Sequence, residues 1–359
     1  MDRENYLDKL SHELTIHEAA SLVARIHELN AQSSSKRFGM YPIKNWSAFT
    51  SLKKLESSRW TADEIEFSGD IHDFNSLSED EQKPLLMAFG FFAVGDGSVA
   101  NCIAFRMILT GLSLQEQAFY ICQLDNERVH AETYGKMIWT LIQDESQRQK
   151  ILESAENIKS IKNMNRYIEK LLQEPEGDKS LFVNLACTEF LMFTPLFCII
   201  FWYRSYYRGK LKKILFSNEQ IAKDEAEHCK YGCDRYKELP KEAQFTDNQI
   251  HQKIAHVVKL VDDFADEALM DVNLPGLKSE QVKQYTRVAA DDLLAELGHS
   301  KLYFEQNPFP WMEFLRLRNK TNFYEGTVGE YGRINVNDAL KSAAAFSGIT
   351  VEPQEELLF

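Results

Sequence analysis

The chain has 359 residues, of which 44% are hydrophobic and 26% charged, as is typical of a soluble globular protein with one large core or two small domains. Its net charge of −13 argues against nucleic acid or an anionic membrane as a partner, because both carry negative charge. The amino terminus lacks an apolar signal core, and the most apolar stretch, 190–202, is shorter than the roughly 20 residues that cross a bilayer. The six cysteines form no C-x-x-C pair, which favours reduced thiols and a cytosolic or nuclear location.

The first 60 residues are predicted to form an N-terminal arm, with a helix near 15–30 and a second segment near 46–54. A long helix then runs to about Leu112, and Ser78-x-x-Glu81 is a capping box at its start. Pro84 lies slightly too deep for the first turn, so we expect either a later start or a kink there.

A second helix is capped by Ser113-x-x-Glu116 and runs to about Gln143. Its inner stripe consists of Phe119, Gln123, Glu127, His130, Tyr134, Ile138 and Leu141. A third helix covers 178–207, and Pro195 should kink or bulge it just after Glu189. The same face of that helix carries Leu185, Glu189, Phe193, Phe197 and Ile200.

Ser217-x-x-Gln220 is predicted to open a fourth helix that ends near Leu239. Amphipathic segments follow at 247–272 and 279–298, and no strand pattern of convincing length occurs. We therefore predict an all-α, ferritin-like helical bundle with additional helices and a flexible C-terminal tail. The predicted divisions are the arm at 1–60, the helical domain at 61–318 and the tail at 319–359.

A repeated pattern indicates a metal centre. Glu127-x-x-His130 and Glu225-x-x-His228 each place a carboxylate and an imidazole on one helix face, because a helix turns once in about 3.6 residues. Asp96 precedes the first copy, on the first long helix, and Glu189 precedes the second. Carboxylates and imidazoles from four helices suit a pair of iron or manganese ions. Each half of the chain thus supplies one helix with a lone carboxylate and one with a Glu-x-x-His pair. This two-fold repeat suggests one histidine for each metal, with the central glutamates as bridges.

Weaker readings of these motifs compete with the metal site. Glu-x-x-His is a common pattern, and a third copy, Glu296-x-x-His299, contains a glycine and is read as structural. The other copies lie on apolar faces, where ionised groups are costly unless they are paired or bind metal. Gly95-x-Gly97-x-x-Ala100 matches a dinucleotide-binding fingerprint, but no parallel strands follow it. We expect these glycines to permit close helix contact instead.

Tyr134 lies one turn beyond His130 on the predicted ligand face. We place it among Phe193, Phe197 and Ile221, in an apolar pocket that would exclude water and reductants. A tyrosine at this spacing is usually a core residue, and only the neighbouring metal site suggests that it is redox-active.

These residues resemble the small, radical-generating subunit of class I ribonucleotide reductase, from about Trp60 to the C-terminus. The family order is Asp, Glu-x-x-His-x-x-x-Tyr, Glu and Asp-Glu-x-x-His. It is matched by Asp96, Glu127, His130, Tyr134, Glu189, Asp224, Glu225 and His228. The segments FSNEQIAKDEAEHC and KTNFYEGTVGEY resemble the eukaryotic or large-DNA-virus branch. Lys223 replaces an arginine that is common before the Asp-Glu pair, and the N-terminal extension of animal members is absent.

The resemblance implies an oxo-bridged pair of iron ions, formed with O2, that leaves a stable radical on Tyr134; manganese is the alternative metal. It implies that Trp60, Asp224, Tyr331 and Glu325 serve electron or radical transfer. It also implies a cytoplasmic homodimer, in host cytoplasm if the protein is viral, that docks on a large catalytic subunit. The implied docking peptide is Glu355, Glu356, Leu357, Leu358 and Phe359.

Three alternatives remain open from the sequence alone. A ligand-binding di-metal oxidase would share the ligands but needs neither Tyr134 nor Trp60, and a hydroxylase subunit would place a substrate cavity beside the metals. An iron-storage protein uses a similar bundle, but storage shells are typically built from much shorter chains.

Overall fold

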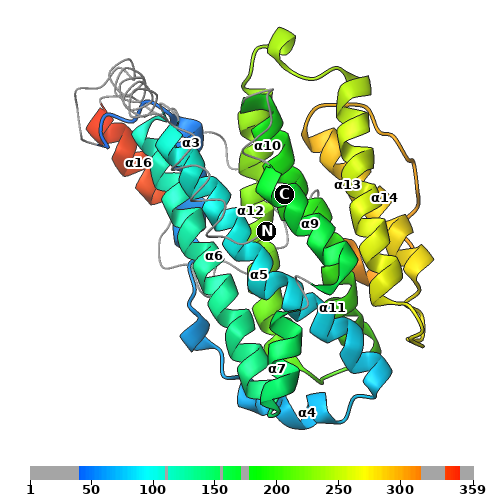
Figure 1. Ribbon diagram of the computed structural model, residues 1–359. Coiled ribbons are helices and arrows are strands. Elements are labelled where there is room, and N and C mark those ends of the chain that lie inside the picture. The colour runs from blue at the N-terminus through cyan, green and yellow to red at the C-terminus, as the bar shows by residue number, and fades with distance from the viewer. Residues whose placement is uncertain (1–39, 110–111, 154–156, 171–177, 317–335, 348–359) are drawn as a thin grey trace, which may run out of the picture.

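The computed structural model describes residues 40–109, 112–153, 157–170, 178–316 and 336–347, and its regular elements within these ranges are all helical (Figure 1). The all-α prediction is therefore confirmed. The longer helices are α3 (Trp46–Ser57), α5 (Glu79–Leu109), α6 (Leu114–Leu141), α7 (Glu145–Leu152), α9 (Lys159–Lys170), α10 (Asp178–Ala186), α11 (Thr194–Tyr206), α12 (Lys212–Lys237), α13 (Asp247–Ala268), α14 (Ser279–Glu296) and α16 (Val336–Ser347). The shorter elements are η1 (Ala62–Glu64), η2 (Phe67–Asp70), α4 (Ile71–Asn75), η4 (Cys187–Met192), η5 (Lys241–Ala243) and η6 (Pro310–Leu315).

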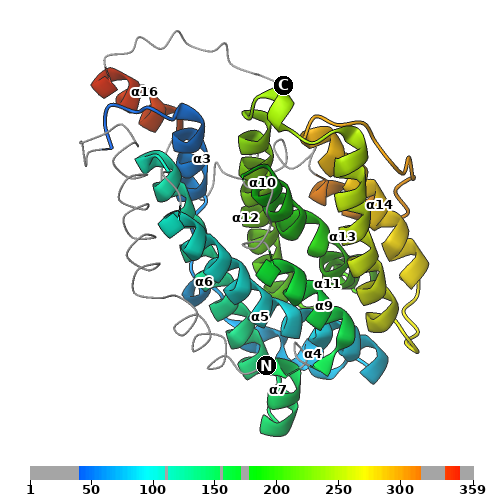
Figure 2. The ribbon, with the colours of Figure 1, turned by 45° about the horizontal axis from the view of Figure 1, so that its top comes forward.

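The long helices lie side by side in a bundle. Figures 1 and 2 show α5 along α6, α10 beside α12 and α13 beside α14, and each of these pairs is in contact. Their apolar faces form one continuous buried cluster that extends from Ile43 in the N-terminal part to Ala343 in α16. A shared core of this kind fixes the relative positions of the helices that carry the predicted ligands.

The first two long helices begin as their capping motifs predict. The Ser78 N–H donates to Glu81 Oε2 at 2.8 Å, and the Glu81 N–H donates to Ser78 Oγ at 3.4 Å. The corresponding distances at Ser113 and Glu116 are 2.9 and 3.3 Å. Pro84 lies inside α5, which begins at Glu79, so the first of the two expected alternatives, a later start, is wrong. The reciprocal cap is sufficient to start the helix ahead of the proline.

The third long helix is interrupted at the predicted ligand. Cys187–Met192 forms a π-helical segment, η4, between α10 and α11. The expected bulge is present, but it contains Glu189 instead of following it, and Pro195 lies in the first turn of α11. Proline is well tolerated there, because first-turn N–H groups have no intrahelical acceptor. The wider turn of a π-helix changes the direction in which its side chains point and is frequent at functional sites.

The fourth long helix begins at Lys212, so the predicted start at Ser217 is wrong. Asp70 caps the helix from another part of the chain: its Oδ2 accepts from the N–H groups of Lys213 and Ile214, each at 2.8 Å. Ser217 is buried inside α12, where its hydroxyl donates to the Ile214 carbonyl at 2.8 Å. A cap supplied by a distant carboxylate leaves no local motif to recognise.

Two helices at the ends of the described chain pack on each other. Phe49 and Leu55 of α3, within the predicted arm, belong to the main buried cluster. Helix α16 was not predicted from the sequence, and it lies against α3 in both ribbon views (Figures 1 and 2). Its fully or partly buried side chains follow helical spacing: Val336, Ala339, Leu340, Ala343 and Ala344.

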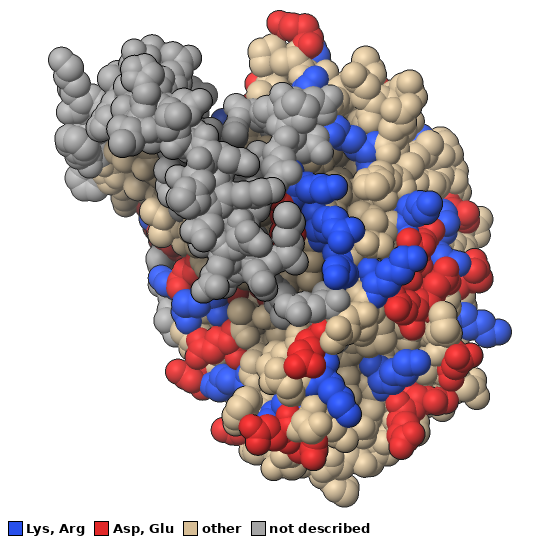
Figure 3. All heavy atoms as spheres, in the orientation of Figure 1, with Lys and Arg blue, Asp and Glu red and all other residues tan. Residues whose placement is uncertain are grey.

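Two helical runs, Glu79–Ala104 and Lys179–Tyr206, are long and apolar enough by length and composition to cross a membrane. The second extends well beyond 190–202, so the length argument from sequence does not hold. Burial provides the better criterion, because 69% and 100% of their apolar windows are covered by the protein itself. On the face shown in Figure 3, acidic and basic side chains lie close to one another over the lower half.

Candidate metal centre

The predicted ligands meet in the interior of the bundle. They come from α5, α6, η4 and α12, and none is more than 3% exposed. The set is Asp96, Glu127, His130, Glu189, Glu225 and His228. Their donor atoms form two groups, each lying within 4.8 Å: Asp96, Glu127 and His130 in one, and Glu127, Glu189, Glu225 and His228 in the other.

Glu127 and Glu225 lie between the two imidazoles. Glu225 Oε1 is 3.0 Å from His130 Nδ1, and its Oε2 is 3.1 Å from His228 Nδ1. Glu127 Oε2 is 3.7 Å from His130 Nδ1, and its Oε1 is 3.3 Å from His228 Nδ1. Each glutamate therefore presents one oxygen toward each histidine, an arrangement suited to bridging two ions.

Burial and mutual repulsion set the protonation of these groups. Burial raises the pKa of Asp96 and of Glu189 well above its ordinary value, and the Glu127 charge adds to the effect. Burial alone would lower the pKa of His130, but the Glu225 charge and hydrogen bonds outweigh it, and the pKa is raised. Burial also opposes ionisation of Glu225, yet the His130 charge lowers the pKa of Glu225 overall. Bound protons thus partly neutralise a cluster whose charge would otherwise be strongly negative.

Several donor atoms of the centre form no well-directed hydrogen bond among the residues that the structure describes, although Glu225 Oε1 and His130 Nδ1 lie 3.0 Å apart as an ion contact. They are both oxygens of Asp96, both of Glu127, Glu189 Oε2, Glu225 Oε1 and His130 Nδ1. A buried polar atom without a partner costs about 1–3 kcal/mol, so such a concentration in one place calls for an explanation. Divalent metal ions provide it, since carboxylate oxygens with one imidazole per group are the ligands of iron and manganese. The residues fit a di-metal site.

Outer partners hold both histidines. His130 Nε2 lies 3.2 Å from Asp224 Oδ2, and the same oxygen accepts from Trp60 Nε1 at 2.8 Å. The Trp60 and His130 rings are stacked, with centroids 6.1 Å apart. On the other side, Asn126 Nδ2 lies 3.4 Å from His228 Nε2. The structure thus brings Trp60 and Asp224 to the metal centre by direct hydrogen bonds.

Sequence reasoning gave no role to Gln123 or Asn126. Gln123 Nε2 donates to Glu189 Oε1 at 2.8 Å, which leaves Oε2 as the oxygen that faces the cluster. Both side chains are buried. Gln123 lies four residues before Glu127, on the same face of α6. This polar residue on a ligand face could have been recognised from the sequence as a hydrogen-bond partner of a ligand.

Tyr134 is fully buried in an aromatic cluster. Phe92 stacks on its ring at 4.7 Å with an interplanar angle of 4°, and Phe89 lies at 6.1 Å. Phe193 and Phe197 pack on Phe92, at 5.1 and 5.4 Å. The phenol donates to Asn218 Oδ1 at 2.6 Å, and burial raises the pKa of Tyr134 well above its ordinary value, with the Asp96 charge adding to it.

The third residue of the predicted pocket, Ile221 on α12, is also fully buried. Three residues near Tyr134 were not predicted: Phe89, Phe92 and Asn218. Phe92 lies four residues before Asp96 and Asn218 seven before Glu225, so helical spacing from the ligands would have found both. Glu325, Tyr331 and the terminal peptide Glu355–Phe359 lie outside the residues that the structure describes.

The remaining motifs have structural roles. His299 contacts Asp247 at 2.7 Å and Tyr236 at 2.9 Å, as expected for a structural residue. Residues 95–100 lie inside α5, so no dinucleotide-binding turn forms there. The expected close helix contact at Gly95 and Gly97 is wrong: the atoms nearest to a Cβ at Gly95 belong to Phe91 of the same helix, at 3.4 Å and beyond, and a Cβ at Gly97 would meet nothing within 4 Å. Gly232 has that role instead, because the Phe182 carbonyl of α10 would lie 3.1 Å from its Cβ.

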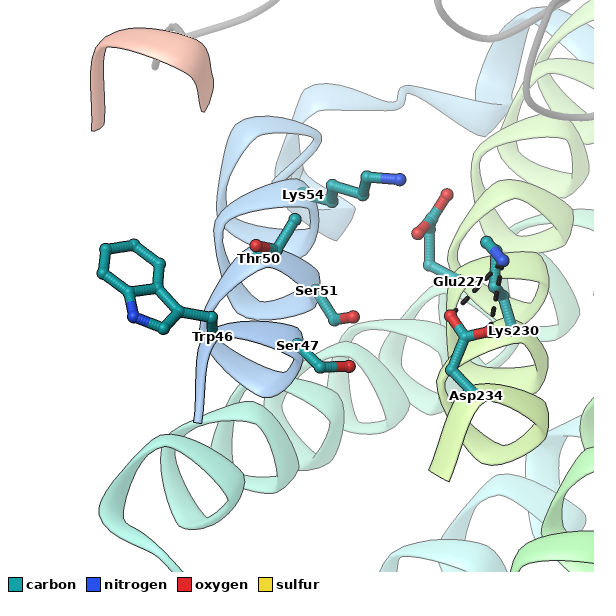
Figure 4. Close-up of a pocket in the computed structure, with 8 residues that line it drawn as sticks. All are labelled: Trp46, Ser47, Thr50, Ser51, Lys54, Glu227, Lys230 and Asp234. Atoms are coloured by element: carbon teal, nitrogen blue, oxygen red, sulfur yellow. Dashed lines mark hydrogen bonds and ion pairs between the residues drawn. The ribbon is translucent and has the colours of Figure 1, made fainter. Parts of the chain in front are cut away.

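A separate surface groove lies between α3 and α12 (Figure 4). It has a volume of about 260 Å³ and is lined by Trp46, Ser47, Thr50, Ser51, Lys54, Glu227, Lys230 and Asp234. Lys230 pairs with Asp234 at 3.3 Å along the wall that α12 forms, as the dashed lines in Figure 4 show. None of the predicted ligands lines the groove.

Comparison with known proteins gives a consistent result. The profile of the family described as ribonucleotide reductase, small chain, matches residues 37–308. A ribonucleoside-diphosphate reductase small chain from Arabidopsis thaliana is 33% identical over 310 residues, covering 86% of this chain and 89% of the plant protein. The small chain from vaccinia virus (strain Western Reserve) is 32% identical over 300 residues, covering 84% and 92%.

Solved structures show a similar fold. The Rnr4 homodimer of Saccharomyces cerevisiae ribonucleotide reductase matches with a TM-score of 0.69 and 24% identity, over 81% of this chain and 91% of that one. Dimanganese(II)-NrdF from Streptococcus sanguinis matches with a TM-score of 0.68 and 19% identity, over 79% and 99%. At these identities the structural likeness concerns the fold alone.

Proposed function

Since this chain belongs to the ribonucleotide reductase small-chain family, we propose that it generates and stores a radical on Tyr134 for a large chain that reduces ribonucleoside diphosphates. The observation that carries the proposal is the buried pair of ligand groups that share Glu127, with a fully buried tyrosine on the same helix. Neither a storage protein nor a simple binding module needs a fully buried phenol with an aromatic ring stacked on it, one turn from a ligand.

In the proposed site, Asp96 and His130 hold one iron ion, Glu189 and His228 hold the other, and Glu127 and Glu225 lie between them. Two iron ions with O2 supply a one-electron oxidant strong enough for a phenol. Other residues of the chain fix the orientation of these ligands. Gln123 restrains Glu189, and Asp224 restrains the His130 ring, because an imidazole whose outer N–H is bonded keeps one orientation and one tautomer. Manganese in place of iron would use the same donors.

The aromatic surroundings of Tyr134 support its role as the stored radical. Phe92 covers one face of the ring, and the side chain has no exposed surface. Water and soluble reductants are therefore kept from the phenol oxygen. The same packing would disfavour a substrate cavity at this position, which sets the proposal apart from a hydroxylase subunit.

We assign the electron route to Trp60 and Asp224. The Trp60 N–H donates to the oxygen that also contacts His130, so a continuous hydrogen-bonded path joins the metal centre to a residue only 8% exposed. Tyr331 would continue this route to the large chain, Glu325 would assist it, and Glu355–Phe359 would dock. We further propose a cytoplasmic homodimer, the state named for the yeast Rnr4 relative.

The decisive experiment is low-temperature EPR after anaerobic Fe(II) loading and exposure to O2, beside a Tyr134→Phe control. A tyrosyl signal in the wild type only, with oxidised-iron absorption in both proteins, would support the proposal. Iron oxidation without a radical would favour a di-metal oxidase or a manganese enzyme, and repeating the loading with Mn(II) separates these two. Absence of metal uptake would overturn the proposal at its first step. Tyr331→Phe should abolish turnover with the large chain while leaving the Tyr134 signal intact.

A further inference from the structure

The Tyr134 hydroxyl is held by one amide side chain of α12. It donates to Asn218 Oδ1 at 2.6 Å, a short distance for a hydrogen bond between neutral groups. Asn218 has no exposed surface, so water does not compete for its oxygen. It lies seven residues before Glu225, which places both on the same face of α12.

The orientation of this amide is fixed from its other end. Asn218 Nδ2 donates to the Ile214 backbone carbonyl at 2.8 Å. A carbonyl oxygen can only accept, so the NH2 group must face Ile214 and the amide oxygen must face the phenol. Turning the amide over would set two oxygens against each other at Ile214 and remove that bond. Toward Tyr134, Asn218 is therefore an acceptor only.

We propose that Asn218 is a positioning residue that orients the Tyr134 hydroxyl and favours its reduced phenol form over the radical. This inference rests on the proposed function. In the one-electron couple the O–H bond breaks: the electron passes to the oxidant, or to a mediator in a titration, and the proton passes to solvent. The radical oxygen then has no hydrogen to donate, and Asn218 loses its partner while remaining buried. The hydrogen bond is present only in the reduced state, so it raises the reduction potential of the couple.

This effect has a use in a radical store. A side chain that makes the radical a stronger oxidant helps it to draw an electron from a distant residue, while the surrounding rings protect it from adventitious reductants. Phe92 and Asn218 would thus have opposing effects: the ring preserves the radical kinetically, and the amide raises its oxidising power. Removing Asn218 should leave a radical that forms readily but transfers less well.

The first test requires no metal. Asn218→Leu and Tyr134→Phe are made singly and together in the full chain, and thermal unfolding is measured on the metal-free proteins. The shifts in melting temperature should not add, because either change removes the same hydrogen bond. Thr286→Ala is the matched control: Thr286 is buried and bonds the Val282 carbonyl of α14, at 3.0 Å, away from the Ile214 carbonyl that holds Asn218, so its effect should add to that of Tyr134→Phe. Asn218→Ala replaces Asn218→Leu if the leucine variant does not fold.

The second test measures the radical. After loading with Fe(II) and O2, each protein is held with redox mediators until the Tyr134 signal measured by EPR no longer changes, because the buried ring exchanges electrons with them slowly. At one applied potential, Asn218→Leu should hold a radical-to-phenol ratio roughly two- to tenfold above that of wild type and Thr286→Ala. An unchanged ratio, or additive shifts in the metal-free cycle, would overturn the inference. A wild type without any radical would overturn the proposed function instead, and the metal-free cycle would still test the hydrogen bond.

Discussion

Replacing Asp224 tests whether the link between His130 and Trp60 supports the metal centre, the electron route or both. A single oxygen, Oδ2, lies 3.2 Å from His130 Nε2 and 2.8 Å from Trp60 Nε1. Asp224→Asn can place its amide oxygen at this position, so it removes the negative charge and retains an acceptor. Asp224→Leu removes the charge and the acceptor together and leaves two buried N–H groups unpaired.

The expected magnitudes follow from this geometry. Loss of an outer partner of a metal-bound histidine typically weakens metal binding ~10–100-fold. We expect Asp224→Asn near the lower end and Asp224→Leu near the upper end of that range. Each buried N–H left without an acceptor costs about 1–3 kcal/mol, so Asp224→Leu should also lower the free energy of unfolding by about 2–6 kcal/mol.

Competition with a chelating dye measures the metal affinity, and denaturant unfolding measures the stability. Turnover with the large chain at saturating metal reports electron transfer through Trp60. Asp234→Asn, in the surface groove of the same helix, is the matched control and should leave all three unchanged. Turnover should fall in both Asp224 variants even when the metal sites are full. Equal metal affinities in wild type, Asp224→Asn and Asp224→Leu would refute the outer-partner role, and full turnover of Asp224→Leu would refute the electron route.

Three further predictions concern the ligands and the tail helix. In the metal-free protein, burial and then the Glu127 charge raise the pKa of Asp96 and Glu189, so the folded state binds more protons than the unfolded chain above their ordinary values of 3.8 and 4.5. Stability measured by urea unfolding should therefore fall as the pH rises above these values, whereas metal affinity should rise. Gln123→Leu should weaken metal binding ~10–100-fold in the dye competition, while Gln117→Leu should not, because Gln117 is a half-buried residue of α6 that bonds the Leu112 carbonyl. Equal affinities would contradict the restraint on Glu189. Leu340→Glu should release α16 from α3 at a cost of about 1 kcal/mol or more, seen as faster amide exchange over 336–347 with unaltered metal binding; unchanged exchange would show that the contact does not hold the helix.

Local patterns in the sequence predict much of this structure, because the interactions that they encode are themselves local. The capping boxes at Ser78 and Ser113 begin helices within the same few residues that form them. The stripe on α6 is buried as predicted, from Phe119 to Leu141. Because residues three apart share a helix face, the sequence alone placed each Glu-x-x-His pair on one face. Asp96 and Glu189 were identified because a carboxylate on an apolar helix face is costly unless it is paired or binds metal.

The parts that could not be predicted depend on contacts between distant segments. Asp70 caps α12 from 143 residues away, so the local Ser217 motif gave the wrong start. The partners of Tyr134 come from α5 and α12, so no pattern around Tyr134 itself identifies Phe92 or Asn218, and only their spacing from Asp96 and Glu225 points to them. The α16 helix is short and acquires its buried face from α3, so its alanine-rich stripe resembles an unstructured tail until the partner helix is known.

The centre is nearly symmetric in its ligands and asymmetric in the groups behind them. Each half has one histidine from a Glu-x-x-His pair, and the glutamates of both pairs lie between the halves. Behind His130 is a carboxylate that also bonds Trp60, whereas behind His228 is the neutral amide of Asn126, at 3.4 Å. A carboxylate makes the imidazole that it contacts a stronger donor to a metal, and an amide does so less. Because only one histidine has a charged partner that extends to an oxidisable ring, an electron supplied from Trp60 would enter the proposed centre through its His130 half.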